Sequence, residues 1–220
     1  MADLFFYGTL RHPPLLKQVL GREVEMLPAN LADHAVYWAK GQGFPLIRAE
    51  PGARAVGVLV RGLSAGDVAR LDFYEGAFSF TLETRRVATP AGEAAAQVYF
   101  PDTGRFELGA RWSLEDWQAR LGDLNTTAAQ EIMAWFGRKD AQAIAERDLP
   151  IRIRAAGRLA AQARAPDPAR DLARDVRVEQ RTAPYIGFFA MEEMQLRHRR
   201  HDGSMSAPLH RSALMTGQAA

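Results

Sequence analysis

The first 109 residues consist of short apolar runs that glycine and proline interrupt at close intervals. Runs of this length, rich in β-branched and aromatic side chains, are typical of β-strands. Only residues 64–73 show apolar side chains at helical spacing, and a serine begins that segment. The clearest strands are residues 4–7, 55–60, 86–89 and 95–100. Strands that mostly follow one another, with one helix packed on them, predict an α+β fold with a small mixed β-barrel over residues 1–109.

Two further zones follow the predicted barrel. Residues 110–165 are expected to form a helical extension, because Ser113 and Thr127 each stand three residues before an acid or amide, a helix-capping pattern. A third helix is expected from Pro150. The proline-containing residues 166–174 predict a linker. Residues 175–220 turn strand-rich again, and we expect a hairpin of residues 186–197 and 208–215 in an incomplete module.

Composition limits the classes of protein to consider. A chain of 220 residues can bury one or two cores. The absence of cysteine excludes disulfides, thiolate zinc sites and a cysteine nucleophile. A net charge of +2 gives a weak field, so no nucleic-acid partner is expected, and the excess of arginine over lysine is typical of GC-rich bacterial genomes. The chain shows neither an apolar run of membrane-spanning length nor a signal segment, which predicts a cytoplasmic protein with no membrane partner.

Two segments of the first zone carry candidate chemistry. Tyr7, Gly8, Thr9 and Leu10 follow the first strand, where a glycine lets a ligand approach the backbone and the next N–H groups can bind an anion. Glu75 ends the predicted helix among aromatic residues. Such neighbours exclude water and raise a carboxyl pKa toward neutrality, as a general base requires. Each segment taken alone is also explained by an ordinary turn or helix cap.

Together these segments resemble the γ-glutamylcyclotransferase-like (AIG2-like) family. The resemblance covers about residues 2–102 and is carried in order by Tyr7-Gly8-Thr9-Leu10 and by residues 43–47, 56–60 and 71–76. It implies a small mixed barrel whose first strand ends in a substrate-binding loop. Glu75 matches the family's catalytic glutamate. We expect substrate contacts from Tyr7, Gly8, Thr9, Leu10 and Tyr99.

The reaction that this resemblance implies is intramolecular. The α-amine of a small γ-glutamyl amide or peptide attacks its own γ-carbonyl, closes 5-oxoproline and expels the attached amine. Glu75 would take the ammonium proton and pass it to the leaving nitrogen, while backbone N–H groups of Gly8, Thr9 and Leu10 hold the α-carboxylate or the oxyanion. The resemblance implies neither a cofactor nor a metal. The sequence departs from the family after Gly76, where Phe78 and Phe80 stand in place of the usual tyrosine.

Several histidines and arginines have a functional and a structural interpretation. For His12 a solvated loop position is favoured over binding of an acidic substrate. The series Arg152, Arg154, Arg158 and Arg164 is expected to form a solvated face rather than an anion site. His198 and His201 precede Asp202-Gly203, a turn signal, so a basic β-turn is favoured over a metal site.

The third zone carries a second resemblance. Residues 185–189 and 196–206 resemble the segment before the catalytic core of Nudix hydrolases of the ADP-ribose pyrophosphatase type, where such strands help to build a dimer. The Nudix box does not occur in this sequence, so hydrolysis of nucleoside diphosphates by this chain is not expected.

The two resemblances leave two functions open. The aromatic residues around Glu75 favour a γ-glutamylcyclotransferase-like enzyme, an acyltransferase or lyase. The missing tyrosine and the incomplete third zone favour a non-catalytic metabolite-binding module of a Nudix protein, related to chains that carry a tellurite-resistance label. In either case we expect a small γ-glutamyl metabolite as ligand and a homodimer through the C-terminal strands.

Overall fold

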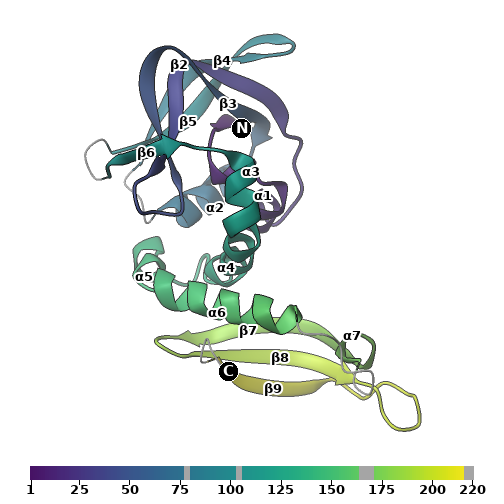
Figure 1. Cartoon of the computed structure of the whole chain (residues 1–220). Helices are drawn as coiled ribbons and strands as arrows, with labels where there is room; N and C mark the ends of the chain where they lie inside the picture. The colour runs from purple at the N-terminus through teal and green to yellow at the C-terminus, as the bar shows by residue number, and fades with distance from the viewer. Residues whose placement is uncertain (77–79, 103–105, 164–170, 216–220) are drawn as a thin grey trace. The chain divides into compact units, whose positions relative to one another are not determined.

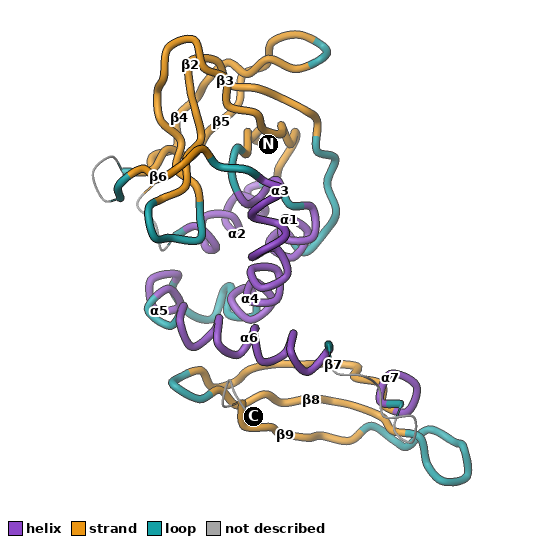
Figure 2. The backbone as a smooth tube through the Cα atoms, in the orientation of Figure 1, coloured by secondary structure: helices purple, strands orange, loops and turns teal. Residues whose placement is uncertain are grey.

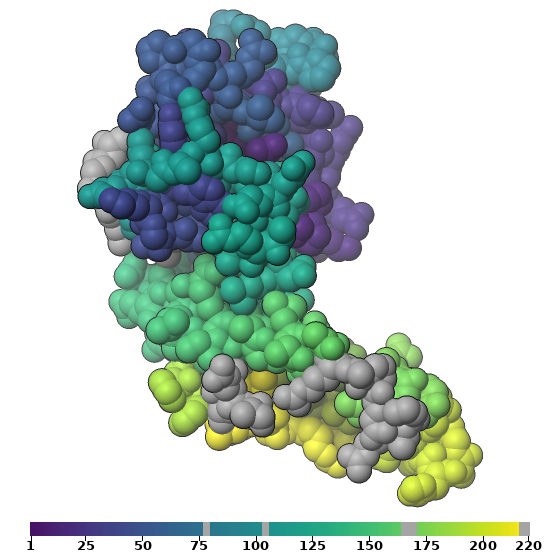
Figure 3. Space-filling model, viewed as in Figure 1, coloured from purple at the N-terminus to yellow at the C-terminus, as the bar shows by residue number. Residues whose placement is uncertain are grey.

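The computed structural model describes residues 1–76, 80–102, 106–163 and 171–215. Contacts divide the chain into two units, Met1–Ala145 and Glu146–Ala220. Figure 3 colours the first unit from purple to green and the second from green to yellow. The boundaries predicted at residues 109, 165 and 174 stay predictions, and residues 166–170 of the predicted linker lie outside the described residues.

The first unit contains a closed five-stranded barrel. Its strands follow the order β3-β1-β5-β4-β2, and β2 also pairs with β3, which closes the sheet (Figure 1). The pair β1–β5 is parallel and the other neighbours are antiparallel. These strands are β1 (Ala2–Phe6), β2 (Leu27–Ala39), β3 (Pro45–Leu63), β4 (Phe80–Thr89) and β5 (Gly92–Pro101), and β6 (Leu108–Arg111) adds to β2. The predicted α+β class with a small mixed barrel is confirmed.

Helices gather on one side of this barrel. Figure 2 shows α1 (Pro13–Leu20), α2 (Ala65–Glu75) and α4 (Asp123–Met133) together beside the strands of the first unit. The shorter α3 (Leu114–Trp117) leads through the π-helix Gln118–Gly122 into α4, and α5 (Ala141–Ala145) ends the unit.

Four elements of the first unit were not predicted from the sequence, namely α1, β2, β6 and α5. The prediction of a single helix before residue 109 is wrong, because a further helix, α1, begins at Pro13. Proline is tolerated in the first turn of a helix, where its missing N–H would have no intrahelical acceptor. Strand β2 was missed because Pro28 and polar residues interrupt its apolar pattern, yet eleven of its residues pair in register with β3.

Two hydrophobic clusters hold the first unit together. One fills the barrel and includes Phe5, Tyr7, Leu59 and Val98. The other lies between the barrel and the helices and includes Leu4, Leu10, Leu16, Leu71 and Trp117. Successive residues of β1 enter opposite clusters, because side chains alternate across a strand.

The predicted helix start at Ser64 is confirmed by a full capping box. The Ser64 hydroxyl accepts from the amide of Asp67 at 3.1 Å, and the Asp67 carboxylate accepts from the amide of Ser64 at 2.9 Å. Arg22 donates two hydrogen bonds to the same carboxylate, at 3.1 and 2.7 Å. The guanidinium lowers the pKa of Asp67 far below its usual range. This arrangement fixes the start of the helix that carries Glu75.

Of the two later capping predictions, one is right. Ser113 caps α3 by accepting from the amide of Asp116 at 3.2 Å. Thr127 does not begin a helix: it lies inside α4, because the π-helix continues the preceding turn without a break.

The second unit contains a helix and a three-stranded antiparallel sheet. The helix α6 (Asp148–Gln162) confirms the third predicted helix, and Figure 1 shows it alongside the sheet. The short helix α7 (Leu172–Asp175) precedes β7 (Val176–Ile186), β8 (Ala190–His198) and β9 (Leu209–Met215), which lie in that order. The expected pairing of β8 with β9 is confirmed. Residue 186, however, ends β7 instead of beginning β8.

The expectation of a solvated arginine face on α6 is wrong for Arg154 and Arg158, whereas Arg152 forms an exposed ion pair with Asp148 at 2.7 Å. Arg154 is buried, and Arg158 forms an ion pair with the buried Glu192 of β8. Arg181 of β7 lies 3.8 Å from the same carboxylate. Burial of the Glu192 carboxylate requires such compensation, and the ion pair of Arg158 with Glu192 joins the helix to its sheet. Arg164 lies outside the described residues.

None of the helices in the described ranges is both long and apolar enough to cross a membrane.

Candidate functional site

Glu75 is the last residue of α2 and lies half-buried. Removal of its carboxyl from water raises the pKa of Glu75 from 4.5 to about 7. At neutral pH the group is therefore close to half ionised, so it can both accept and return a proton. The raised pKa expected from its aromatic neighbours is confirmed.

Two tyrosines share the electrostatic environment of Glu75. Tyr7 follows β1 and is buried, and Tyr99 lies on β5, the parallel neighbour of β1. Burial raises the pKa of each phenol above its ordinary value, and the negative charge of Glu75 raises it further. The charge of Glu75, at the end of α2, therefore acts on one tyrosine that follows β1 and on another that lies on β5.

Asp72 is a partner that the sequence analysis missed. The Tyr99 hydroxyl donates to Asp72 Oδ1 at 2.7 Å, which ties β5 to the last turn of α2. Asp72 lies three residues before Glu75, and residues at this spacing occupy the same helix face. That spacing was the available signal, although only the fold could show that Tyr99 binds Asp72.

The loop after Tyr7 forms a tight turn. Residues Thr9–Arg11 form a 3₁₀ helix, and the amide of Arg11 donates to the carbonyl of Gly8 at 3.0 Å. A Cβ atom on Gly8 would lie 3.0 Å from Pro45 Cγ, so a side chain here would require the Pro45 ring to move by a few tenths of an ångström. The Leu10 side chain is buried in the core, which leaves only its backbone for a ligand. The substrate contacts expected from Gly8, Thr9 and Leu10 stay predictions.

His12 is not the solvated loop residue that was favoured. Its ring lies 5.7 Å from that of Trp117 in an edge-on contact, and its Nδ1 is 2.9 Å from Gln118 Nε2. Burial lowers the pKa of His12, with a smaller opposing effect of Asp123. The histidine therefore packs the loop against the helix after α3.

Phe80 occupies part of the stretch where the family usually has a tyrosine. It begins β4, and its ring lies 6.1 Å from the ring of Tyr99. Tyr99, whose hydroxyl donates to Asp72, therefore lies beside Phe80. Phe78 lies outside the described residues.

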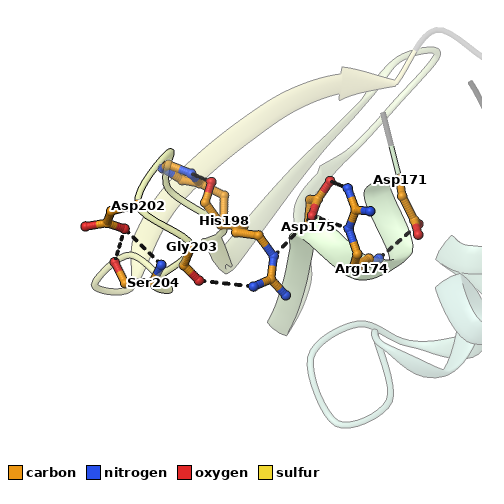
Figure 4. Close-up of polar contacts among 8 residues, drawn as sticks. Asp171, Arg174, Asp175, His198, Asp202, Gly203 and Ser204 are labelled. Carbon is orange, nitrogen blue, oxygen red and sulfur yellow. Dashed lines mark hydrogen bonds and ion pairs between the residues drawn. The ribbon is translucent and has the colours of Figure 1, made fainter. Parts of the chain in front are cut away.

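His198 and His201 lie at or beside a hydrogen-bonded turn. Asp202 accepts from the Ser204 amide at 2.8 Å and from its hydroxyl at 2.6 Å, and Figure 4 shows this turn beside His198. His198 Nδ1 lies 3.1 Å from the carbonyl of Arg199, and the Arg199 guanidinium reaches Asp175 at 3.2 Å. The expected basic turn is confirmed.

Metal-ligating side chains do not cluster in the part of the chain that the structure describes: no three or more histidine and carboxylate residues gather there.

The first unit thus presents a small mixed barrel with a half-buried carboxyl, that of Glu75, whose charge acts on two tyrosines, Tyr7 and Tyr99. The family model described as gamma-glutamyl cyclotransferase, AIG2-like matches residues 4–119, just over half of the chain, and the protein belongs to this family. This confirms the resemblance drawn from the motifs of the first zone. The Nudix resemblance of the third zone stays a prediction.

The chain is also similar to curated relatives and to solved structures. Protein AIG2 B of Arabidopsis thaliana is 24% identical over 135 residues, which are 60% of this chain and 80% of that protein. Protein AIG2 A of the same plant is 23% identical over 135 residues, with 60% and 79% covered. A structure titled gamma-glutamyl cyclotransferase is 14% identical, with a TM-score of 0.43 and 76% and 89% of the chains covered. An AIG2-like protein from Mus musculus is 18% identical, with a TM-score of 0.42 and 51% and 88% covered.

Proposed function

We propose that the protein cyclises the γ-glutamyl group of a small amide or peptide to 5-oxoproline and releases the attached amine. The observation that supports this most is the half-buried Glu75 carboxyl, whose pKa of about 7 suits a base that also returns its proton. Membership of the gamma-glutamyl cyclotransferase, AIG2-like family agrees with the same reaction class.

In the proposed reaction Glu75 transfers protons, and the protein holds the substrate in a bent conformation in which its amine lies against its own γ-carbonyl. Glu75 takes a proton from the α-ammonium, and the freed amine attacks the γ-carbonyl carbon of the same molecule. The attacking nitrogen loses its second proton to water, the bond from that carbon to the leaving nitrogen breaks, and Glu75 returns its proton to the leaving nitrogen. A positioned acid–base group contributes roughly 10²- to 10⁴-fold in rate. Holding amine and carbonyl together supplies much of the remainder, because the attack is already intramolecular.

The two tyrosines are proposed to orient the substrate rather than to act as bases. Their pKa values lie above the ordinary value, so both phenols stay protonated at neutral pH. The proton of Tyr99 is directed to Asp72, which leaves the Tyr99 oxygen free to accept from an ammonium group. Backbone N–H groups of Gly8, Thr9 and Leu10 are proposed to hold the α-carboxylate or the oxyanion.

The assay follows 5-oxoproline released from a panel of γ-glutamyl amides and peptides. Glu75→Gln should reduce kcat/KM by at least about 10²-fold, because the change keeps the size of the side chain and removes the base. Glu25→Gln, at an exposed position, is the matched control and should leave the rate unchanged. The rate of the unmodified protein should rise with pH around a midpoint near 7, since Glu75 must be ionised to accept the proton. A Glu75→Gln protein with a near-normal rate would refute the proposal.

The non-catalytic alternative predicts a different outcome in the same assay. Phe80 in place of the usual tyrosine is the observation that favours it. A metabolite-binding module would bind γ-glutamyl compounds, measured by calorimetry, and release no 5-oxoproline from any of them.

A further inference from the structure

The hydroxyl proton of Tyr99 has a fixed direction. Tyr99 on β5 donates this proton to Asp72 Oδ1 at 2.7 Å. A phenol carries one proton, so the bond leaves only the lone pairs of the Tyr99 oxygen for other groups. Asp72 lies in the last turn of α2, three residues before Glu75, and side chains at this spacing share one helix face with Cβ atoms about 5–6 Å apart. The Tyr99 hydroxyl therefore lies against the face of α2 that carries Glu75.

The Glu75 carboxyl accepts no hydrogen bond from the residues that the structure describes. Burial therefore acts on this carboxyl without a compensating donor and raises its pKa to about 7. The Tyr99 phenol is within reach of the Glu75 charge, because burial, Asp72 and Glu75 together raise the pKa of Tyr99. Tyr99 is thus a protonated hydroxyl that acts beside one carboxyl and donates to another.

A second tyrosine–glutamate pair in this protein shows the opposite arrangement. Tyr37 on β2 donates its hydroxyl proton to Glu50 on β3. This bond, with smaller contributions from Arg111 and Arg48, lowers the pKa of Glu50. A hydrogen bond to a carboxylate stabilises its charged form. The same bond from Tyr99 to Glu75 would lower the pKa of Glu75 and make it a weaker base.

On the basis of the proposed function, we propose that Asp72 is a positioning residue that binds the Tyr99 proton and so keeps the Glu75 carboxylate without a hydrogen bond. The carboxylate then stays basic enough to take a proton from the substrate ammonium. The Tyr99 oxygen presents a lone pair, which suits an N–H of the same ammonium. Loss of the Asp72 acceptor frees the Tyr99 proton for Glu75, because an ionised carboxylate is a strong acceptor.

Other charged groups also lie on the elements around Glu75. The elements α1, α4 and β3 pack against α2. They carry Lys17 on α1, Asp123 and Glu131 on α4, and Arg48, Glu50, Arg54 and Arg61 on β3. The charge of Glu75 also acts on Tyr7, which follows β1. All of these groups stay in place when only Asp72 and Tyr99 are changed, so a difference between such variants reports the Asp72–Tyr99 bond.

The test follows the ionisation of Glu75 itself. The protein is labelled with carbon-13 at the glutamate side-chain carboxyls, and the signal missing from Glu75→Gln identifies Glu75 in NMR spectra recorded against pH. The midpoint should lie near 7 in the unmodified protein and at least about one pH unit lower in Asp72→Ala. Asp72→Asn keeps an acceptor oxygen and should retain a midpoint near that of the unmodified protein. Spectra in roughly 1 M salt screen the charge of the exposed Asp72, so the remaining shift reports the hydrogen bond.

Removal of the Tyr99 hydroxyl separates the bond from every other effect of Asp72. Tyr99→Phe alone should leave the midpoint unchanged, because the Tyr99 proton goes to Asp72 in the unmodified protein. The double variant Asp72→Ala with Tyr99→Phe should lack the downward shift of Asp72→Ala. Glu115→Ala, at an exposed position on α3, is the control for loss of a surface carboxylate and should keep the midpoint. Where Asp72→Ala does not fold by circular dichroism, Asp72→Leu decides, since it also removes the acceptor.

The outcomes separate this inference from the proposed function. An unchanged midpoint in Asp72→Ala, an equal shift in Asp72→Asn, or an equal shift with and without the Tyr99 hydroxyl overturns the role of Asp72. The midpoint of kcat/KM for 5-oxoproline release should move in the same direction in the same variants. Absence of release from every γ-glutamyl compound overturns the proposed function, and the titration of Glu75 still decides whether Asp72 holds the Tyr99 proton away from it.

Discussion

Glu75 lies where its charged form is disfavoured, so this one residue links stability to pH. Its pKa of about 7 in the folded state exceeds the ordinary value of 4.5. The folded state therefore holds the proton more tightly than the unfolded state, and stability falls as pH rises between about 4.5 and 7. Glu75→Gln removes this dependence, so it should stabilise the protein at pH 8 by up to about 3 kcal/mol and have little effect near pH 4.5. Urea unfolding at both pH values measures the difference, and an equal effect at both would contradict the assignment.

Strand β3 passes so close to β1 in the barrel that Gly57 of β3 cannot be replaced without strain. A Cβ atom on Gly57 would lie 2.3 Å from the Phe5 ring and 2.5 Å from the carbonyl oxygen of Phe6. Gly57→Ala should therefore lower the free energy of unfolding by about 1–3 kcal/mol, the usual cost of overpacking. Gly66→Ala in α2 is the control, because its Cβ would meet nothing closer than 3.7 Å, and it should leave stability unchanged or raised. Chemical unfolding of both variants tests this, and equal stabilities would show that β3 can move away from β1.

At the scale of the whole molecule, the first unit is expected to supply the stable core and the activity, and the second unit the contact between two copies of the chain. Both hydrophobic clusters lie within residues 1–145, so a protein of those residues should stay folded and keep any 5-oxoproline release. In the second unit Tyr185, Met191 and Leu214 are exposed and in register across the three strands. We propose that a second copy of the chain covers them, because exposed apolar patches of this kind mark interfaces. Sedimentation should show a dimer for the full chain and a monomer for residues 1–145. Unfolding of the shorter protein, or identical association states, would contradict this division.

Local patterns determined much of the first unit. The apolar runs predicted β1, β4 and β5 and part of β3, since strand preference depends on neighbouring side chains. The serine before α2 predicted its start, because capping involves residues only three apart. The motif residues predicted the family, and the aromatic neighbours of Glu75 predicted the direction of its pKa shift.

Only the tertiary structure decided which residues meet. Closure of the barrel depends on β2, whose pattern was too irregular to recognise until β3 paired along it. The bond from Tyr99 to Asp72 and the stacking of Arg11 on Trp112 join residues that are distant in the sequence. The burial of Glu192 likewise required Arg158 on another element. No local pattern contains such contacts, because their free energy is gained only when the sheet and helices have packed together.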